Sequence, residues 1–239
     1  MKFNWVIIFF STLIFFSAQT KAEQTLSLKE NTVIDLLFLN DIADNGKLKK
    51  QYFTDVAPIA KAMGYQPIMG FRITKKPIQG NYFPNVLAIA QWPGNMDDRQ
   101  KLFEQLLVKV PDLHAKRFDI WSSFNMSNYY VSKDKTLTFK DDKRYVLSAF
   151  WQSNEKAFQD YMAQYVRKVE SAGGKVLIKL NEGSSLFGYL YNPDFTFITE
   201  WNDMSAFERF SQSAKVNNSN NSGVKHINEF HLEPIKRKS

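Results

Sequence analysis

Residues 196–204 read TFITEWNDM, and this stretch decides the fold because an earlier stretch repeats its pattern. The earlier copy is VLAIAQWPGNM at residues 86–96. Each copy is an apolar strand that ends in Trp, continues through a short polar turn and opens a helix at Met. Trp92 and Trp201 are 109 residues apart. The pair indicates an internal duplication and predicts that both Trp side chains are buried anchors of equivalent structure.

Two further landmarks recur in the same order. Gly64 and Gly174, 110 residues apart, each follow a helical pattern and precede an apolar strand. Glycine is the residue that most readily adopts the left-handed conformation that ends a helix. Residues 124–126 (FNM) and 230–232 (FHL), 106 apart, fall in the last expected strand of each copy. The nearly constant offset makes Asn125 and His231 near-equivalent in this alignment.

Each copy predicts the order strand, helix, strand, strand, helix, strand. The clearest helix is 155–171, whose apolar side chains follow the i, i+3, i+4, i+7 spacing of one face. Polar segments with Gly and Pro, 74–84 and 181–194, join the second and third strands. The expected strands are 33–39, 66–71, 86–92 and 124–131, then 145–151, 175–180, 196–201 and 229–234; the other expected helices are 48–63 and those that follow Met96 and Met204.

Two segments lie outside these units. Residues 132–142 form a charged linker, with a possible short strand at 136–139. Residues 215–223 are a polar, low-complexity loop, either solvated surface or a lid. The sequence therefore predicts an α+β fold with two tandem ferredoxin-like repeats, 23–131 and 143–239. The two repeats are expected to form an intramolecular α+β barrel, a monomer with internal pseudo-twofold symmetry.

Residues 197–210 (FITEWNDMSAFERF) resemble the strand–turn–helix core of small proteins of the DUF1330 and NIPSNAP type. These belong to the dimeric α+β barrel superfamily, and the resemblance implies that two ferredoxin-like units pair their sheets into a barrel. The superfamily includes cofactor-free monooxygenases, haem-dependent enzymes and isomerases. A fold shared by so many chemistries does not select a reaction.

Residues 1–22 read as a signal peptide. Lys2 supplies the positive start, an apolar run covers residues 5–16, and Thr20-Lys21-Ala22 offers a small-residue cleavage site. The run is short for a membrane span, although an uncleaved anchor is the alternative. No later stretch approaches the ~18 apolar residues of a transmembrane helix. We therefore expect a periplasmic or secreted protein that begins near Glu23.

Composition excludes several classes of site. The chain has no Cys, which removes thiol nucleophiles, redox pairs and Cys-ligated metals. Its 31 Lys and Arg are scattered among 24 Asp and Glu, unlike the clustered basic groove of a nucleic-acid-binding protein. No metal-binding spacing, phosphate-binding Gly-rich loop or serine-hydrolase motif is present. We expect neither a metal nor a nucleic-acid partner.

The candidate ligand-binding residues are His231, Glu200 and Asn125, all on expected strands. His231 could serve as a general base or an axial haem ligand if it faces the barrel interior, or be an edge histidine. Glu200 could be a desolvated acid beside Trp201, but strand alternation favours a packed Trp and a solvated carboxylate. We expect any ligand to lie between the two sheets, or that space to be filled by aromatic side chains.

The sequence thus predicts an exported protein that binds a small apolar molecule or a protein partner, without a cofactor. The alternative is a cofactor-free or haem-dependent monooxygenase or isomerase. The abundant aromatic residues, 21 Phe, 10 Tyr and 5 Trp, are expected either to line an apolar cavity or to fill the core.

Overall fold

The computed structural model describes residues 23–74, 76–186, 189, 191–214 and 223–236. The predicted signal peptide and most of the loop 215–223 lie outside these residues. The first repeat contains β2 (Thr32–Asp41), α1 (Gly46–Asp55), α2 (Ala57–Ala62), β3 (Gln66–Ile73), β4 (Val86–Pro93), α3 (Met96–Lys109), α4 (Leu113–Phe118) and β5 (Trp121–Val131). The second contains β7 (Arg144–Gln152), α5 (Glu155–Ser171), β8 (Lys175–Asn181), β9 (Phe195–Trp201), α6 (Met204–Ala214) and β10 (Val224–Pro234).

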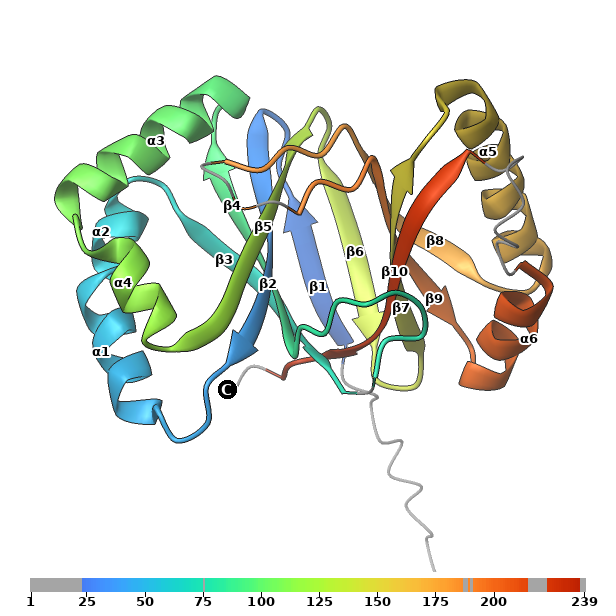
Figure 1. Cartoon of the computed structure of the whole chain (residues 1–239), viewed down its shortest axis with the longest axis horizontal. Helices are drawn as coiled ribbons and strands as arrows, with labels where there is room; N and C mark the ends of the chain where they lie inside the picture. Colours follow the sequence, from blue (N-terminus) through green and yellow to red (C-terminus); the bar gives the residue numbers. More distant parts are fainter. Residues whose placement is uncertain (1–22, 75, 187–188, 190, 215–222, 237–239) are drawn as a thin grey trace, which may run out of the picture.

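The two repeats have the same strand order, as the duplication predicts. One eight-stranded sheet runs β5-β2-β4-β3-β10-β7-β9-β8, so each repeat places its last strand beside its first, then its third, then its second. The helices of each repeat cover the outer face of its half of the sheet, at opposite sides of the molecule (Figure 1). The protein is an α+β fold of two ferredoxin-like repeats.

Alternation along the strands separates two kinds of buried surface. In β2, Ile34, Leu36 and Phe38 belong to the core between the two repeats, whereas Leu37 and Leu39 belong to the layer beneath the first repeat's helices. The second repeat has its own helix-side layer, which includes Phe150 of β7. The molecule therefore has one central core and two outer helix–sheet layers.

The long connectors between the second and third strands tie the repeats together. The first connector pairs with β10, since Gln79 and Glu229 form an antiparallel bridge. The second connector pairs with β5 through an equivalent bridge between Ser184 and Asn128. Each connector therefore crosses to the last strand of the other repeat, and β3 also pairs directly with β10.

The central core is filled with aromatic rings rather than open. Tyr82 and Tyr191, one from each connector, are in contact, with ring centroids 5.0 Å apart and ring planes tilted by 37°. Phe38 lies 4.5 Å from Tyr191, and Phe230 lies 6.3 Å from Tyr82. These contacts fit the expectation that aromatic side chains fill the space between the two repeats. A ligand bound at this place would have to displace these rings.

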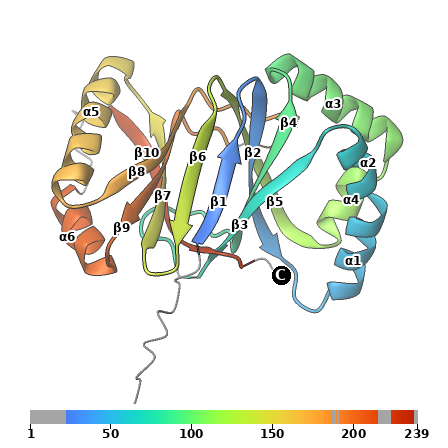
Figure 2. The same cartoon turned by 180° about the vertical axis from the view of Figure 1, so that it is seen from behind.

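A second, two-stranded sheet pairs β1 (Glu23–Leu28) with β6 (Lys135–Lys140), between the repeats (Figure 2). Its apolar side chains Leu26, Leu28, Leu137 and Phe139 join the central core. The short strand predicted within the linker is present, whereas β1 was not predicted. Residues 132–142 are thus more than a connector, because Leu137 and Phe139 pack into the core.

Two further differences concern the first repeat. The single helix expected at 48–63 is divided into α1 and α2 at Val56, and Pro58 is the second residue of α2. Proline lacks the N–H that a continuous helix needs and favours a helix's first turn. The short helix α4 was not predicted. Among the described helices, none is both long and apolar enough to cross a membrane.

Candidate functional site

The two helix–sheet layers differ at the strand residues that face the helices. At the 109-residue offset, Val86 and Ala88 of β4 correspond to Phe195 and Phe197 of β9. Phe197 packs against Phe150, with ring centroids 5.9 Å apart, in a layer full of aromatic rings. Smaller side chains in β4 leave space at the corresponding place in the first repeat.

The helices strengthen this asymmetry. The long helix α5 buries four side chains against the second half of the sheet: Phe158, Met162, Tyr165 and Val169. Its counterpart in the first repeat is divided: α1 buries no side chain, and α2 buries only the small side chain of Ala60. The second layer is therefore a packed core, and the first is not closed at the α1 side.

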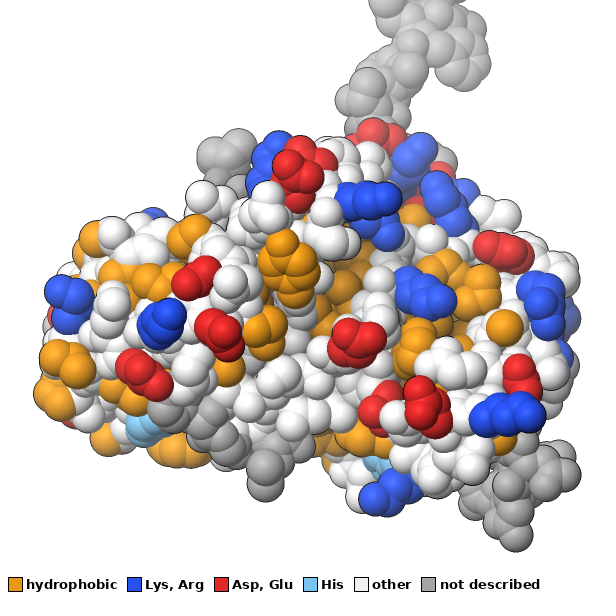
Figure 3. Space-filling view, turned by 90° about the horizontal axis from the view of Figure 1, so that it is seen from above, with side chains coloured by type: hydrophobic (Ala, Val, Ile, Leu, Met, Phe, Trp, Pro, Cys, Tyr) orange, Lys and Arg blue, Asp and Glu red, His pale blue; other side chains and the backbone are white. Residues whose placement is uncertain are grey.

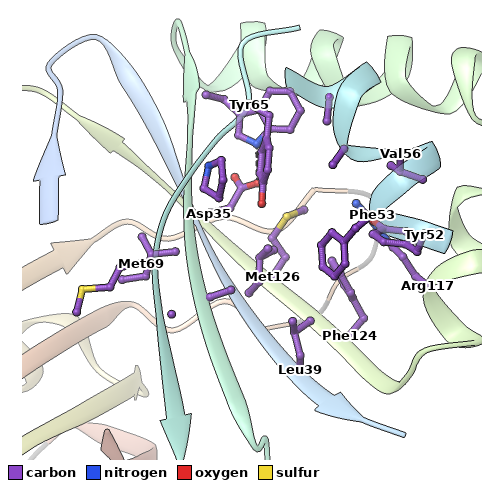
Figure 4. A pocket seen from close by; sticks show the side chains of 18 of the residues that line it. Asp35, Leu39, Tyr52, Phe53, Val56, Tyr65, Met69, Arg117, Phe124 and Met126 are labelled. Carbon is purple, nitrogen blue, oxygen red and sulfur yellow. Dashed lines mark hydrogen bonds between the residues drawn. The ribbon is translucent and has the colours of Figure 1, made fainter. Parts of the chain in front are cut away.

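The result is a cavity of about 590 Å³ between the first repeat's helices and the outer face of the sheet. Its walls are mainly apolar; Figure 4 shows Phe53 and Val56 on the helix side, facing Leu39, Phe124 and Met126 on the strands. A cavity of this size with apolar walls and a few polar groups is typical of small-molecule sites.

A buried ion pair lies at one end of the cavity. Asp35 of β2 and Arg99 of α3 are 2.7 Å apart, and their side chains are only 3% and 2% exposed. Asp35 also accepts hydrogen bonds from Trp92 Nε1 at 2.9 Å and from Asn128 Nδ2 at 2.5 Å. The Arg99 guanidinium lies over the Trp92 ring, 4.3 Å from its centroid. Asp35 therefore receives N–H donors from three elements, which holds Arg99 in one orientation.

Not every hydrogen-bonding group in this cluster is used. The donor Arg99 Nη1 and the acceptor Asn128 Oδ1 are buried without a hydrogen-bond partner. Arg99 is one of the residues that line the cavity, while its Nη1 is enclosed by protein. A buried polar group without a partner costs free energy, about 1–3 kcal/mol or more when charged, unless something else binds it.

Arg117 of α4 is a second buried guanidinium on the cavity wall. It donates Nη1–H to the Tyr189 hydroxyl at 2.8 Å and Nε–H to the Tyr52 hydroxyl at 3.3 Å. Its guanidinium lies 4.4 Å from the Phe124 ring centroid. Within the described part of the chain, no carboxylate forms an ion pair with Arg117. Tyr189 comes from the second repeat, so the crossing connector completes the first repeat's site.

Tyr65 is the third polar group of the wall. Burial, and to a smaller extent the nearby Asp35 carboxylate, raise the pKa of its hydroxyl to about 12. Tyr65 therefore stays a neutral hydroxyl at physiological pH. It lies next to Asp35 in the close-up (Figure 4).

The structure does not bring the three predicted site residues together. Asn125 does face the central core, where its Nδ2 donates to the Tyr82 hydroxyl at 2.8 Å. Glu200 accepts from the Tyr145 hydroxyl at 3.3 Å on the inward face of β9, as alternation predicts beside the buried Trp201. His231 lies on the helix side of β10, 6.3 Å from the Phe207 ring of α6.

His231 therefore does not face the central core, and the register gives the reason. Phe38 pairs with Asn125, and its counterpart Ala149 pairs with Asn228. Asn125 is thus equivalent to Asn228, an offset of 103 instead of 106. A shift by an odd number of residues moves a side chain to the other face of a strand.

Haem does not fit the cavity wall. Haem iron is held in proteins by His, Cys, Met with His, or Tyr. The chain has no Cys, and no histidine is among the cavity's described lining residues. His114 of α4 forms a hydrogen bond between its Nδ1 and the Tyr189 hydroxyl, at 3.0 Å. The raised pKa of Tyr65 disfavours a tyrosinate ligand. No group of three or more metal-binding side chains occurs among the described residues.

Sequence reasoning overlooked Asp35, Arg99, Arg117 and Tyr189. One signal was available for Asp35, because it is a carboxylate inside the apolar run of residues 33–39. A charged residue within a strand buried on both faces calls for a partner. Arg99 and Arg117 carried no such signal, since each lies in an ordinary mixture of charged and apolar helix residues.

The solved structures that this chain matches have low sequence identity to it. An anthrone oxidase-like protein is 13% identical, with a TM-score of 0.49, covering 90% of this chain and 98% of its own. A putative monooxygenase from Fusobacterium nucleatum is 14% identical, with a TM-score of 0.46, covering 87% and 94%. A haem-binding protein from Thermus thermophilus is 10% identical, with a TM-score of 0.45, covering 89% and 94%.

Chlorite dismutases have similar scores: one from Candidatus Nitrospira defluvii is 8% identical with a TM-score of 0.45, covering 87% and 93%. No protein-family model and no curated protein matches the chain. The narrower resemblance to DUF1330 and NIPSNAP proteins therefore stays a prediction. The similarity concerns the fold alone.

Proposed function

We propose that this protein binds a small apolar organic molecule in the cavity of its first repeat. The observation that carries the proposal is the asymmetry between the repeats. The same layer that Phe195 and Phe197 fill in the second repeat is a cavity of about 590 Å³ in the first. An ordinary core has few voids larger than a water molecule, so a hollow layer beside a packed twin suggests a binding site.

Filling the cavity tests the proposal. Ala88→Phe gives β4 the side chain that β9 has at Phe197, and the new ring enters the cavity. We expect naphthalene-derived probes to bind the unmodified protein by isothermal titration calorimetry and to lose binding to this variant. The control Ala172→Phe adds the same ring to an exposed position of the second repeat and should leave binding unchanged. Equal binding to all three proteins would rule out this cavity.

Binding of a protein partner receives less support. Basic and acidic side chains are interspersed on the face shown in Figure 3, with no large area of one sign. Such a surface offers little electrostatic steering toward a strongly charged macromolecule. We keep export to the periplasm or outside the cell as part of the proposal, on the signal-like residues 1–22 alone.

A cofactor-free oxygenase is the second candidate, and the buried Arg117 favours it. A fixed guanidinium without a carboxylate partner beside an apolar cavity can stabilise a substrate anion, the species that would react with oxygen. An oxygen electrode with a dihydroxynaphthalene as probe tests this. Uptake that Ala88→Phe abolishes would support an enzyme, whereas binding without uptake would leave a binding protein.

A further inference from the structure

The charges that line the cavity do not balance. The buried charged side chains on its wall are Asp35, Arg99 and Arg117. Asp35 is neutralised by Arg99, which leaves the Arg117 guanidinium in excess. Two lysines, Lys61 and Lys236, also line the cavity, but both are exposed to solvent. The enclosed part of the site therefore carries one uncompensated positive charge.

An unpaired charge in an apolar interior is unfavourable. Tyrosine hydroxyls and aromatic faces offset part of the cost of burying Arg117. They do not supply the opposite charge that buried ions normally require. The structure thus keeps a desolvated guanidinium where only a molecule inside the cavity can neutralise it.

Arg117 is the guanidinium that an anion in the cavity can reach. It lines the cavity, and its Nη1 and Nε donate only to tyrosine hydroxyls. Arg99 is paired with Asp35, and its Nη1 is enclosed by protein. An anion beside Arg117 leaves its apolar body between α1 and β4.

We propose that the ligand is an apolar monoanion, a carboxylate on an aromatic or aliphatic body, bound by Arg117. The proposal rests on the binding function proposed for this cavity and specifies its ligand class. One excess positive charge matches a single negative charge. A phosphate dianion would leave a buried negative charge, and a neutral molecule would leave Arg117 uncompensated.

Matched pairs of probes test the charge separately from the binding. Calorimetry compares 2-naphthoate with 2-naphthamide, and decanoate with decanamide, at pH 7. Each pair has the same body, and only one member carries a charge. We expect the carboxylate to bind about tenfold or more tightly, as hydrogen bonds to charged groups suggest.

Variants of Arg117 test whether this residue causes the preference for the carboxylate. In Arg117→Met we expect the ratio of carboxylate affinity to amide affinity to fall to about one. Arg117→Lys keeps the charge and should retain part of the preference. The control Arg167→Met, an exposed residue of α5, should behave as the unmodified protein does. A melting curve accompanies each variant, and the comparison of probes on the unmodified protein needs no variant.

The outcomes separate the two proposals. Equal or tighter binding of the amides would overturn the monoanion while leaving the cavity as a binding site. A carboxylate preference that Arg117→Met leaves intact would assign the charge recognition elsewhere and overturn the role of Arg117. Failure of all four probes to bind would overturn both proposals.

Discussion

Asp35 and Arg99 form the most buried ion pair of the described chain, and their energetics differ from those of the surface pairs. The other described pairs have side chains at least 31% exposed. Exposed pairs contribute little to stability because water screens them. Breaking a buried pair is costly because one charge is left in the interior without its partner.

We therefore predict that Asp35→Asn destabilises the protein by about 3–5 kcal/mol, since Arg99 loses its counter-charge. Urea denaturation measures the loss. The control is Asp55→Asn, which changes an exposed carboxylate at the end of α1 and should leave the denaturation midpoint unchanged. Equal midpoints for both variants would mean that Arg99 does not depend on Asp35.

Glu229 is a buried carboxyl of the second repeat with neutral partners. The hydroxyls of Ser148 and Tyr165 donate to its Oε1 at 2.7 Å and 3.4 Å. Burial raises the pKa of Glu229 above its ordinary 4.5, and these two hydrogen bonds lower it by less. Because the folded pKa exceeds the unfolded one, the group contributes stability below about pH 4.5. That contribution is lost as pH rises through the folded pKa.

Glu229→Gln removes this titration while keeping an acceptor for both hydroxyls. We predict that the variant melts at a higher temperature than the unmodified protein at pH 7, and that the difference shrinks toward pH 4. Thermal melts across this range measure it, with the exposed Glu208→Gln as control. Parallel pH profiles for Glu229→Gln and the unmodified protein would show that Glu229 is not the titrating group.

At the scale of elements, the sequence predicted most helices and strands but not the cavity. The helix at 155–171 was predicted to the residue because one apolar stripe and a capping Asn154 define it. The prediction for the first repeat was less accurate, because α1 buries no side chain and its sequence therefore has little amphipathic pattern. The contrast of Ala88 with Phe197 was visible at the 109-residue offset. To infer a cavity from this contrast, one must know which face of the strands the helices cover.

The connectors are the elements that join the repeats, and Gly80 permits one of them to pass close to β10. Gly80 has a φ of +96°, a conformation that favours glycine. A Cβ there would also lie 2.5 Å from the Ile227 carbonyl oxygen and collide with Asn228. The connector thus has no room for a side chain at this crossing.

We predict that Gly80→Ala lowers stability by at least about 1–3 kcal/mol, the usual cost of a strained backbone residue, with the collision added. Gly173→Ala is the informative control, because Gly173 has a φ of +84° but nothing within 4 Å of its would-be Cβ. In thermal denaturation, Gly80→Ala should have a melting temperature well below that of Gly173→Ala. Equal losses would assign the whole effect to backbone conformation.

At the scale of the whole molecule, the internal duplication explains why the two repeats share one strand order. The divergence of their helix-side residues explains why the first repeat contains the cavity. The repeated landmarks predicted two ferredoxin-like units, and the shared strand order confirms them. The site was not predicted, because Tyr189 and the groups around Arg117 come together only when a connector crosses between repeats. Long-range contacts of that kind leave no local pattern in the sequence.

Export is a prediction about the whole chain that rests on residues 1–22. We predict that the mature protein begins at Glu23 or within a few residues of it, because Ala22 ends a small-residue cleavage site. N-terminal sequencing of protein from the periplasmic fraction measures this. Recovery of the chain in the membrane fraction with Met1 intact would contradict it.

The central claim is that a ligand enters the hollow layer of the first repeat and not its packed twin. Methionine methyl groups report on both layers: Met126 lines the cavity in the first repeat's helix-side layer, and Met162 lies in the second repeat's packed layer. The direct measurement is a methyl NMR titration of the methionine-labelled protein with 2-naphthoate. The account predicts that the Met126 signal shifts and that the Met162 signal stays in place. Saturable shifts confined to Met162, or no shift at either residue, would contradict it.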